Sequence, residues 1–123
     1  TLIAVCTAIH YGVLKFSSQF VTPSRHPGHC LGVAVASIVL AHILEALLYA
    51  TGFWVAVHNF QVGDLVSSSS NGSASLTFMD YFYFSLVNYT TLGRGDLMPN
   101  GHLRFMTAMA AFHGFLCAAD HEW

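Results

Sequence analysis

The composition of the chain excludes most classes of soluble protein. Of its 123 residues 54% are apolar and only 8% are Asp, Glu, Lys or Arg, whereas a soluble domain carries roughly 25% of such charged residues. Ten charged side chains do not cover the surface of a soluble domain of this size, and the apolar residues occur in long blocks. The composition therefore predicts an integral membrane protein of one small domain.

Charge and cysteine content exclude further classes. The formal net charge is −2 and no basic stripe is present, so no nucleic-acid partner is expected. Cys6, Cys30 and Cys117 are scattered and odd in number, without zinc-ligand spacing, which predicts buried thiols and neither a metal nor another cofactor. No nucleophile stands in a Gly-x-Ser-x-Gly context, and we expect no enzymatic activity.

The first candidate span is Thr1–Phe20, whose apolar stretch, Leu2–Phe16, is interrupted by His10 and, near its end, by Lys15. About 20 residues suffice for the ~30 Å hydrocarbon layer, although a buried helix of a soluble protein would have the same composition. Two prolines and a glycine follow within residues 22–29. They predict a loop that ends the first helix.

The clearest membrane span is Leu31–Val57, whose 27 residues include one formal charge, Glu45, and one histidine, His42. This length exceeds the minimum for crossing a bilayer, so the helix can tilt or protrude. Tyr49 and Trp54 lie toward its far end, where aromatic side chains suit the membrane interface.

A polar loop and a short helix come next. Gln61–Ser75 contains four consecutive serines and is predicted to be a flexible aqueous loop. Thr77 and Asp80 have the spacing of a capping box, which predicts a helix start. The run from Thr77 to Tyr89 is about 20 Å long, roughly half to two-thirds of the membrane. Because non-helical backbone cannot face lipid, we expect this helix to be re-entrant and buried in protein or beside water.

The loop after the short helix carries the most specific pattern. It reads Thr90-Thr91-Leu92-Gly93-Arg94-Gly95-Asp96 and precedes the last predicted span, Gly101–Trp123. Glycine adopts φ > 0 without a Cβ clash, so the carbonyl groups of alternate residues can be turned the same way. The pattern predicts an extended loop whose backbone comes close to a ligand.

These residues resemble the pore loop and selectivity filter of the tetrameric potassium-channel family. Six of the seven positions match, whereas Arg94 stands where the family has Tyr or Phe. The resemblance implies an all-α membrane protein with about three transmembrane helices plus a re-entrant pore helix and filter loop. Residues 1–30 would form an N-terminal transmembrane helix and cytoplasmic loop. Residues 31–123 would form a pore domain of outer helix, turret, pore helix, filter and inner helix.

The resemblance also implies a function. Four chains in the lipid bilayer would surround an axis, and the carbonyl groups of residues 91–94 with the Thr91 hydroxyl would replace the hydration shell of a permeating monovalent cation, with K⁺ a candidate. Arg94 favours an alternative, in which the chain is a non-conducting structural or accessory subunit of a larger membrane complex. If the Arg94 side chain lies behind the filter it can pair with Asp96 or Asp80; if it faces the axis, four like charges oppose cation passage.

His42 and Glu45 form an intramembrane polar pair one helical turn apart. Such residues mark function, or they pair with each other or another helix and specify packing. A metal site would also need His10, His113 or His121, and we expect no metal because one helix supplies only two ligands. His42-x-x-Glu45 with the segment Tyr83–Leu86 resembles a bacterial branch of these small channels, which implies the bacterial inner (plasma) membrane.

The basic residues predict the orientation in the membrane. Lys15 and Arg25 border residues 22–30, whereas the serine-rich loop has neither Lys nor Arg. The positive-inside rule places residues 22–30 and the C-terminus in the cytoplasm and Ser67–Ser70 outside. We expect a membrane-impermeant thiol reagent to label Ser69→Cys in intact cells. Labelling only after permeabilisation would contradict this orientation and indicate the opposite one.

Overall fold

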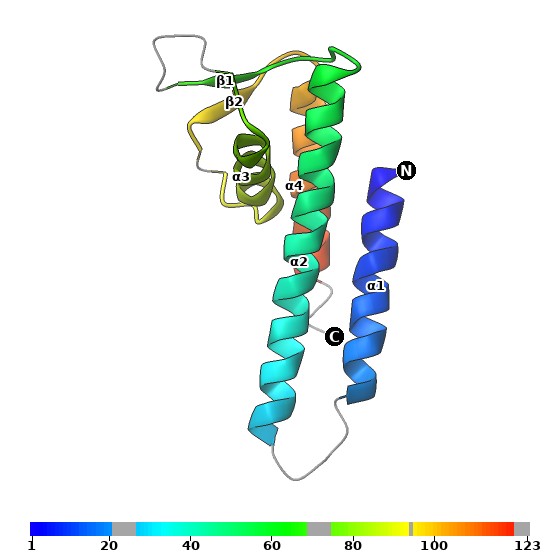
Figure 1. The fold of residues 1–123 in the computed structure, drawn as a ribbon. Coiled ribbons are helices and arrows are strands. Elements are labelled where there is room, and N and C mark those ends of the chain that lie inside the picture. Colours follow the sequence, from blue (N-terminus) through cyan, green and yellow to red (C-terminus); the bar gives the residue numbers. More distant parts are fainter. Residues whose placement is uncertain (21–26, 69–74, 94, 120–123) are drawn as a thin grey trace. The chain divides into compact units, whose positions relative to one another are not determined.

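The structure of the protein is a computed structural model that describes residues 1–20, 27–68, 75–93 and 95–119. This part of the chain is mostly helical and forms two compact units, Thr1–Glu45 and Ala46–Trp123, whose boundary lies inside one long helix. Figure 1 shows the elements in chain order: α1 (Leu2–Phe20), α2 (Pro27–His58), β1 (Leu65–Ser67), α3 (Phe78–Tyr89), β2 (Leu97–Pro99) and α4 (Leu103–Ala119).

The first unit consists of α1 and the first part of α2, which run antiparallel (Figure 1). Among the described residues, Gly28–His58 is the one helical segment both long and apolar enough to cross a membrane. Apolar side chains such as Val35, Val39 and Leu40 are more than half exposed. A helix that is apolar on all faces is typical of a membrane span.

The start of α2 differs from the sequence prediction. The span was expected from Leu31, and residues 22–29 were expected to form a loop, but α2 begins at Pro27. Proline fits the first helical position because its missing N–H would have no intrahelical partner there, and its fixed φ already suits the helix. Residues 21–26 lie outside the described part of the chain.

The predicted start of the short helix is confirmed. Thr77 is the N-cap of α3 and Phe78 its first residue. The Asp80 carboxylate accepts hydrogen bonds from the Thr77 N–H (2.7 Å) and the Thr77 hydroxyl (2.8 Å). These bonds, the backbone one foremost, lower the pKa of the Asp80 carboxyl below its usual 3.8. These hydrogen bonds therefore stabilise the fold at pH values above the pKa that the Asp80 carboxyl has in the unfolded chain. The stabilisation is lost as the pH falls through the lower pKa of this carboxyl in the folded protein.

One face of α3 packs on the last turns of α2. The Ser85 hydroxyl, which is fully buried, donates a 2.7 Å hydrogen bond to the carbonyl oxygen of Ala46. The ring of Phe84 meets that of Phe53 edge to face at 5.4 Å. Tyr81, which is also buried, lies three residues before Phe84 and four before Ser85. Residues at this spacing lie on one side of a helix, so these three residues form the buried face of α3.

α3 also packs against α4, where the backbones come unusually close. A Cβ atom built on Gly114 would overlap the carbonyl oxygen of Tyr89, the last residue of α3. The absence of a side chain at Gly114 is therefore what allows this approach. α4 was predicted over Gly101–Trp123 and is helical from Leu103 to Ala119; residues 120–123 lie outside the described part.

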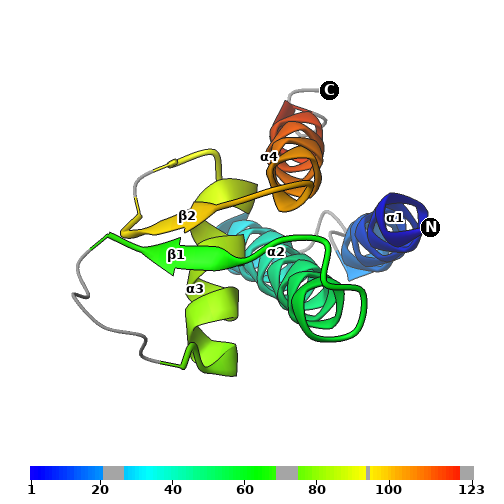
Figure 2. The same cartoon turned by 90° about the horizontal axis from the view of Figure 1, so that it is seen from above.

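A short β-ribbon was not predicted. The segment Gln61–Ser75 was expected to be only a flexible polar loop, but β1 within it pairs antiparallel with β2 (Figure 2). Leu65 of β1 is buried and lies opposite Pro99. The Asn100 N–H donates a 2.8 Å hydrogen bond to the Asp64 carbonyl, so these two residues form a hydrogen-bonded pair. Such pairs alternate along an antiparallel ladder, so Leu65 and Pro99 form a non-hydrogen-bonded pair. Proline is tolerated there because no N–H is required.

The contact at Gly114 gives a prediction about stability. Gly114→Ala should lower the thermal stability of the protein in mild detergent because the new methyl group forces α3 and α4 apart; overpacking of this kind costs about 1–3 kcal/mol. Gly12→Ala is the matched control, since a Cβ at Gly12, also helical, meets no atom within 4 Å. Equal melting temperatures for the two variants would contradict the close approach.

Candidate functional site

The predicted filter loop is bonded to the end of α3. An α-helix leaves its last four carbonyl groups without intrahelical partners. Backbone N–H groups of the loop donate to three of these carbonyls: Thr90 to Leu86 (3.0 Å), Thr91 to Asn88 (3.0 Å) and Gly93 to Val87 (3.2 Å). The Thr90 hydroxyl adds a 2.7 Å hydrogen bond to the Leu86 carbonyl. The first half of the loop is thus fixed to the helix that precedes it.

The backbone of the loop is strained. Thr91 has φ +58° and Gly93 has φ +64°, whereas Leu92 between them is not in the positive-φ region. The left-handed region is rare for a β-branched residue and costs of order 1–3 kcal/mol for a non-glycine residue. Leu92 is 66% exposed. A strained, exposed segment that many hydrogen bonds hold in place is the kind of backbone found at functional sites.

The second half of the loop is bonded to another element. The Asp96 carbonyl oxygen accepts hydrogen bonds from the Ser68 N–H (2.8 Å) and from the Ser68 hydroxyl (3.1 Å). Gly95 and Asp96 are exposed. Arg94 lies outside the described residues, so the predictions about the direction and partners of its side chain remain untested.

A cavity of about 230 Å³ lies beside the loop. Gly93 and Gly95, on either side of Arg94, both line it. The other lining residues come from α3, β2 and α4: Tyr83, Phe84, Val87, Asn88, Leu97, Met98, Pro99 and Thr107. The loop therefore has an open, mostly apolar space on one side rather than a packed core.

The predicted pair of His42 and Glu45 belongs to a larger cluster in the first unit. Glu45 is fully buried. Its Oε2 lies 3.4 Å from Nδ1 of His42, and its Oε1 lies 3.1 Å from Nδ1 of His10 on α1. From the sequence, His10 was considered only as a possible metal ligand. Its isolated position in an apolar helix was the signal that it faces a polar partner.

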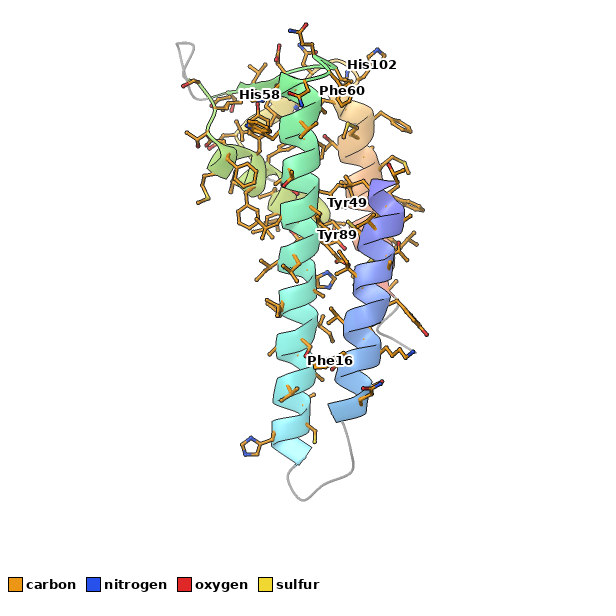
Figure 3. All side chains as sticks on the ribbon, turned by 45° about the vertical axis from the view of Figure 1, so that its right-hand side comes forward. Phe16, Tyr49, His58, Phe60, Tyr89 and His102 are labelled. Atoms are coloured by element: carbon orange, nitrogen blue, oxygen red, sulfur yellow. The ribbon has the colours of Figure 1, made fainter. Side chains whose placement is uncertain are left out.

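A second buried polar cluster was missed, and it lies at the end of α3. The Tyr49 hydroxyl is 3.1 Å from Nδ1 of His113, whose Nε2 is 3.5 Å from the Cys117 sulfur. The Tyr89 ring contacts both: it is tilted against the Tyr49 ring at 5.7 Å and meets the His113 ring edge to face at 6.0 Å. Figure 3 shows Tyr49 beside Tyr89. Tyr49 was predicted to lie at the membrane interface, but its side chain is buried because it reaches α3 and α4 instead.

Trp54 and His58 agree better with an interfacial position. Trp54 is 38% exposed and stacks on the His58 ring at 4.6 Å. In Figure 3, His58 lies with Phe60 and His102 at the end of the second unit that also carries the β-ribbon. Aromatic and polar side chains therefore gather at one end of this unit, as expected where a membrane protein meets water.

One comparison with known proteins identified a relationship. A family model described as an ion channel matches residues 39–119, which are 81 of the 123 residues. The matched region contains the last part of α2, the β-ribbon, α3, the loop and α4. No curated protein and no solved structure matches the chain.

The buried cluster in the first unit gives a second stability prediction. Glu45→Ala should reduce the free energy of unfolding by roughly 2–5 kcal/mol, because it removes the carboxylate that two imidazoles contact and leaves a cavity. Leu44→Ala, next to it on α2 but 41% exposed, is the matched control and should cost much less. Chemical unfolding in detergent measures both. Equal losses would mean that the cluster does not stabilise the fold.

Proposed function

Because the chain belongs to the ion channel family, as the match to residues 39–119 shows, we propose that it forms a membrane pore for monovalent cations. The observation that carries the proposal is the position of the loop Thr90–Asp96 inside the matched region, directly after α3. The chain is an integral membrane protein. A pore of this kind requires four copies around one axis, so we propose a homotetramer.

The backbone of the loop supports this mechanism. Left-handed conformations at Thr91 and Gly93, separated by Leu92, alternate along the loop. Left-handed conformations at every second residue allow the carbonyl groups of alternate residues to be turned toward the same side. With four loops around an axis, carbonyl oxygens of residues 91–94 and the Thr91 hydroxyl would replace the water around a dehydrated cation. The hydrogen bonds from the Thr90, Thr91 and Gly93 N–H groups to α3 would hold this part of the loop in position before the ion arrives.

The arrangement in the membrane is part of the proposal. We propose that α1, α2 and α4 cross the bilayer and that α3 with the loop is re-entrant, as non-helical backbone at membrane depth requires. By the positive-inside rule, Lys15 and Arg25 favour a cytoplasmic position for residues 22–30 and for the C-terminus. The bacterial inner membrane is part of this proposal. The ribbon and the polar residues around His58 would then face outward.

We propose that Arg94, which lies outside the described residues, affects which cation the pore admits. Its side chain would lie behind the loop. Asp96 is the more available partner, because the Asp80 carboxylate already accepts two hydrogen bonds from Thr77. Because Asp96 is exposed, such a pair would hold the loop while contributing little to stability. Potassium is the candidate ion, and ion-flux measurements with K⁺ and Na⁺ test it.

Arg94 also supports a second candidate function, that of a non-conducting accessory subunit in a larger membrane complex. The family has an aromatic residue at this position, and an arginine there alters the surroundings of the filter. The mass of the purified protein in mild detergent separates the two functions, since a conducting filter requires four copies. A monomer without ion flux would favour the accessory subunit.

Gly93 provides the sharpest test of the proposed pore. A Cβ at Gly93 meets only the Thr91 carbonyl oxygen, at 4.0 Å, but the residue has φ +64°. Gly93→Ala therefore introduces backbone strain of about 1–2 kcal/mol rather than a clash. We expect it to abolish cation flux into liposomes while the assembled oligomer remains intact.

The control for this experiment is Gly32→Ala in α2, where a new Cβ meets no atom within 4 Å. Flux through this variant should equal that of the unmodified protein. Undiminished flux through Gly93→Ala would show that the loop does not line the ion pathway. Loss of flux together with loss of the oligomer would instead assign Gly93 to assembly.

A further inference from the structure

The outer end of the loop is held by a segment that lies almost thirty residues earlier in the chain. We propose that Ser68 is a positioning residue for the filter, which it holds through the Asp96 carbonyl and the β-ribbon. The inference rests on the proposed function, because it concerns the ion selectivity of the same loop. The segment between α2 and α3 was predicted from the sequence only as a polar loop. With this inference, it becomes one of the segments that determine the ion selectivity.

The hydrogen bonds divide the loop between two supports. Among the described residues, the bonds to α3 extend as far as the Gly93 N–H, and those from Ser68 are made to the Asp96 carbonyl. A shift of Ser68 would therefore act directly on Asp96, in the second half of the loop. α3 fixes the inner end and the ribbon fixes the outer end.

Ser68 continues the register of the ribbon. Ser67 lies opposite Leu97, so the next residues, Ser68 and Asp96, also lie opposite each other. Their N–H to carbonyl bond (2.8 Å) is the last ladder bond described at this end. The Ser68 hydroxyl adds a second donor to the same oxygen at 3.1 Å. Two donors fix the direction of a carbonyl group more narrowly than one.

The ribbon is stable enough to position the loop, but the loss of a single hydrogen bond can shift its Ser68 end. A two-stranded ribbon is at best marginally stable in water. This one is anchored by the buried Leu65 and by close backbone packing of Gly63 against Asn100. Ser68 itself is exposed and lies at the far end from that anchor. Each hydrogen bond at this end consequently makes a large relative contribution to the position of Asp96.

Three substitutions separate the two donors of Ser68. Ser68→Ala removes the hydroxyl, Ser68→Thr retains it, and Ser68→Pro removes the N–H. The full-length protein in liposomes provides the K⁺/Na⁺ permeability ratio from reversal potentials. Loss of one net hydrogen bond corresponds to roughly a two- to tenfold effect on an equilibrium. We expect the permeability ratio to fall by that factor in Ser68→Ala, further in Ser68→Pro, and not in Ser68→Thr. Ser75→Ala, an exposed serine outside the ribbon, is the matched control.

A reversible cross-link tests the mechanism directly. Ser67 and Leu97 lie opposite each other at a non-hydrogen-bonded pair, where Cα atoms are about 4.5 Å apart, within the range of a disulfide. Ser67→Cys with Leu97→Cys, added to Ser68→Pro, should restore the permeability ratio when oxidised and lose it again on reduction. The single-cysteine variants are the controls for effects of oxidation elsewhere in the chain.

Amide hydrogen exchange reports on the anchor independently of conduction. Exchange at Val66 and Met98 should be faster in Ser68→Pro and slower in the oxidised double-cysteine variant than in the unmodified protein. An unmodified protein that carries no cation flux would overturn the proposed function, and with it the role of Ser68 in selectivity. Normal flux with the same permeability ratio in all the Ser68 variants would overturn this inference alone. An unchanged ratio after cross-linking of Ser68→Pro would also overturn it.

Discussion

The end of α3 is the constraint on which the second unit depends. The last four carbonyl groups of a helix have no intrahelical partners and must find them elsewhere. Here the loop turns back and donates its own N–H groups to three of them, which forces Thr91 into a left-handed conformation. The Tyr89 carbonyl is covered instead by the backbone at Gly114. The strain in the loop is thus the consequence of satisfying the helix end.

Buried polar groups hold the elements around this helix end. Ser85 bonds the backbone of α2, and Tyr49 bonds His113 of α4 beside the Tyr89 ring. Apolar packing distinguishes poorly between neighbouring registers of two helices in lipid, because lipid tails are as apolar as the side chains. A hydrogen bond between two named groups forms in one register only. The polar contacts therefore fix the position of α3, and hence of the loop.

The sequence predicted the helices better than the contacts between them. The capping pattern at Thr77 and Asp80 located the start of α3 because capping is a local interaction. The distant partners of Glu45 and Tyr49 were not predicted, because His10 and His113 are 35 and 64 residues away along the chain. The ribbon was missed for a related reason. Three residues are too few for a periodic pattern, and β1 exists only because β2 lies beside it.

Gly93 and Gly114 show why the sequence reveals the role of one glycine and not of another. Gly93 was recognisable because its motif reflects a backbone conformation, a property of the residue itself, and its φ of +64° agrees. Gly114 lies in an ordinary helical segment of α4, and its role depends on what faces it. Glycine in a helix costs about 1 kcal/mol relative to alanine, so its presence calls for a reason outside the helix. The approach of the Tyr89 carbonyl is that reason, and it ties α4 to the residue that precedes the proposed filter.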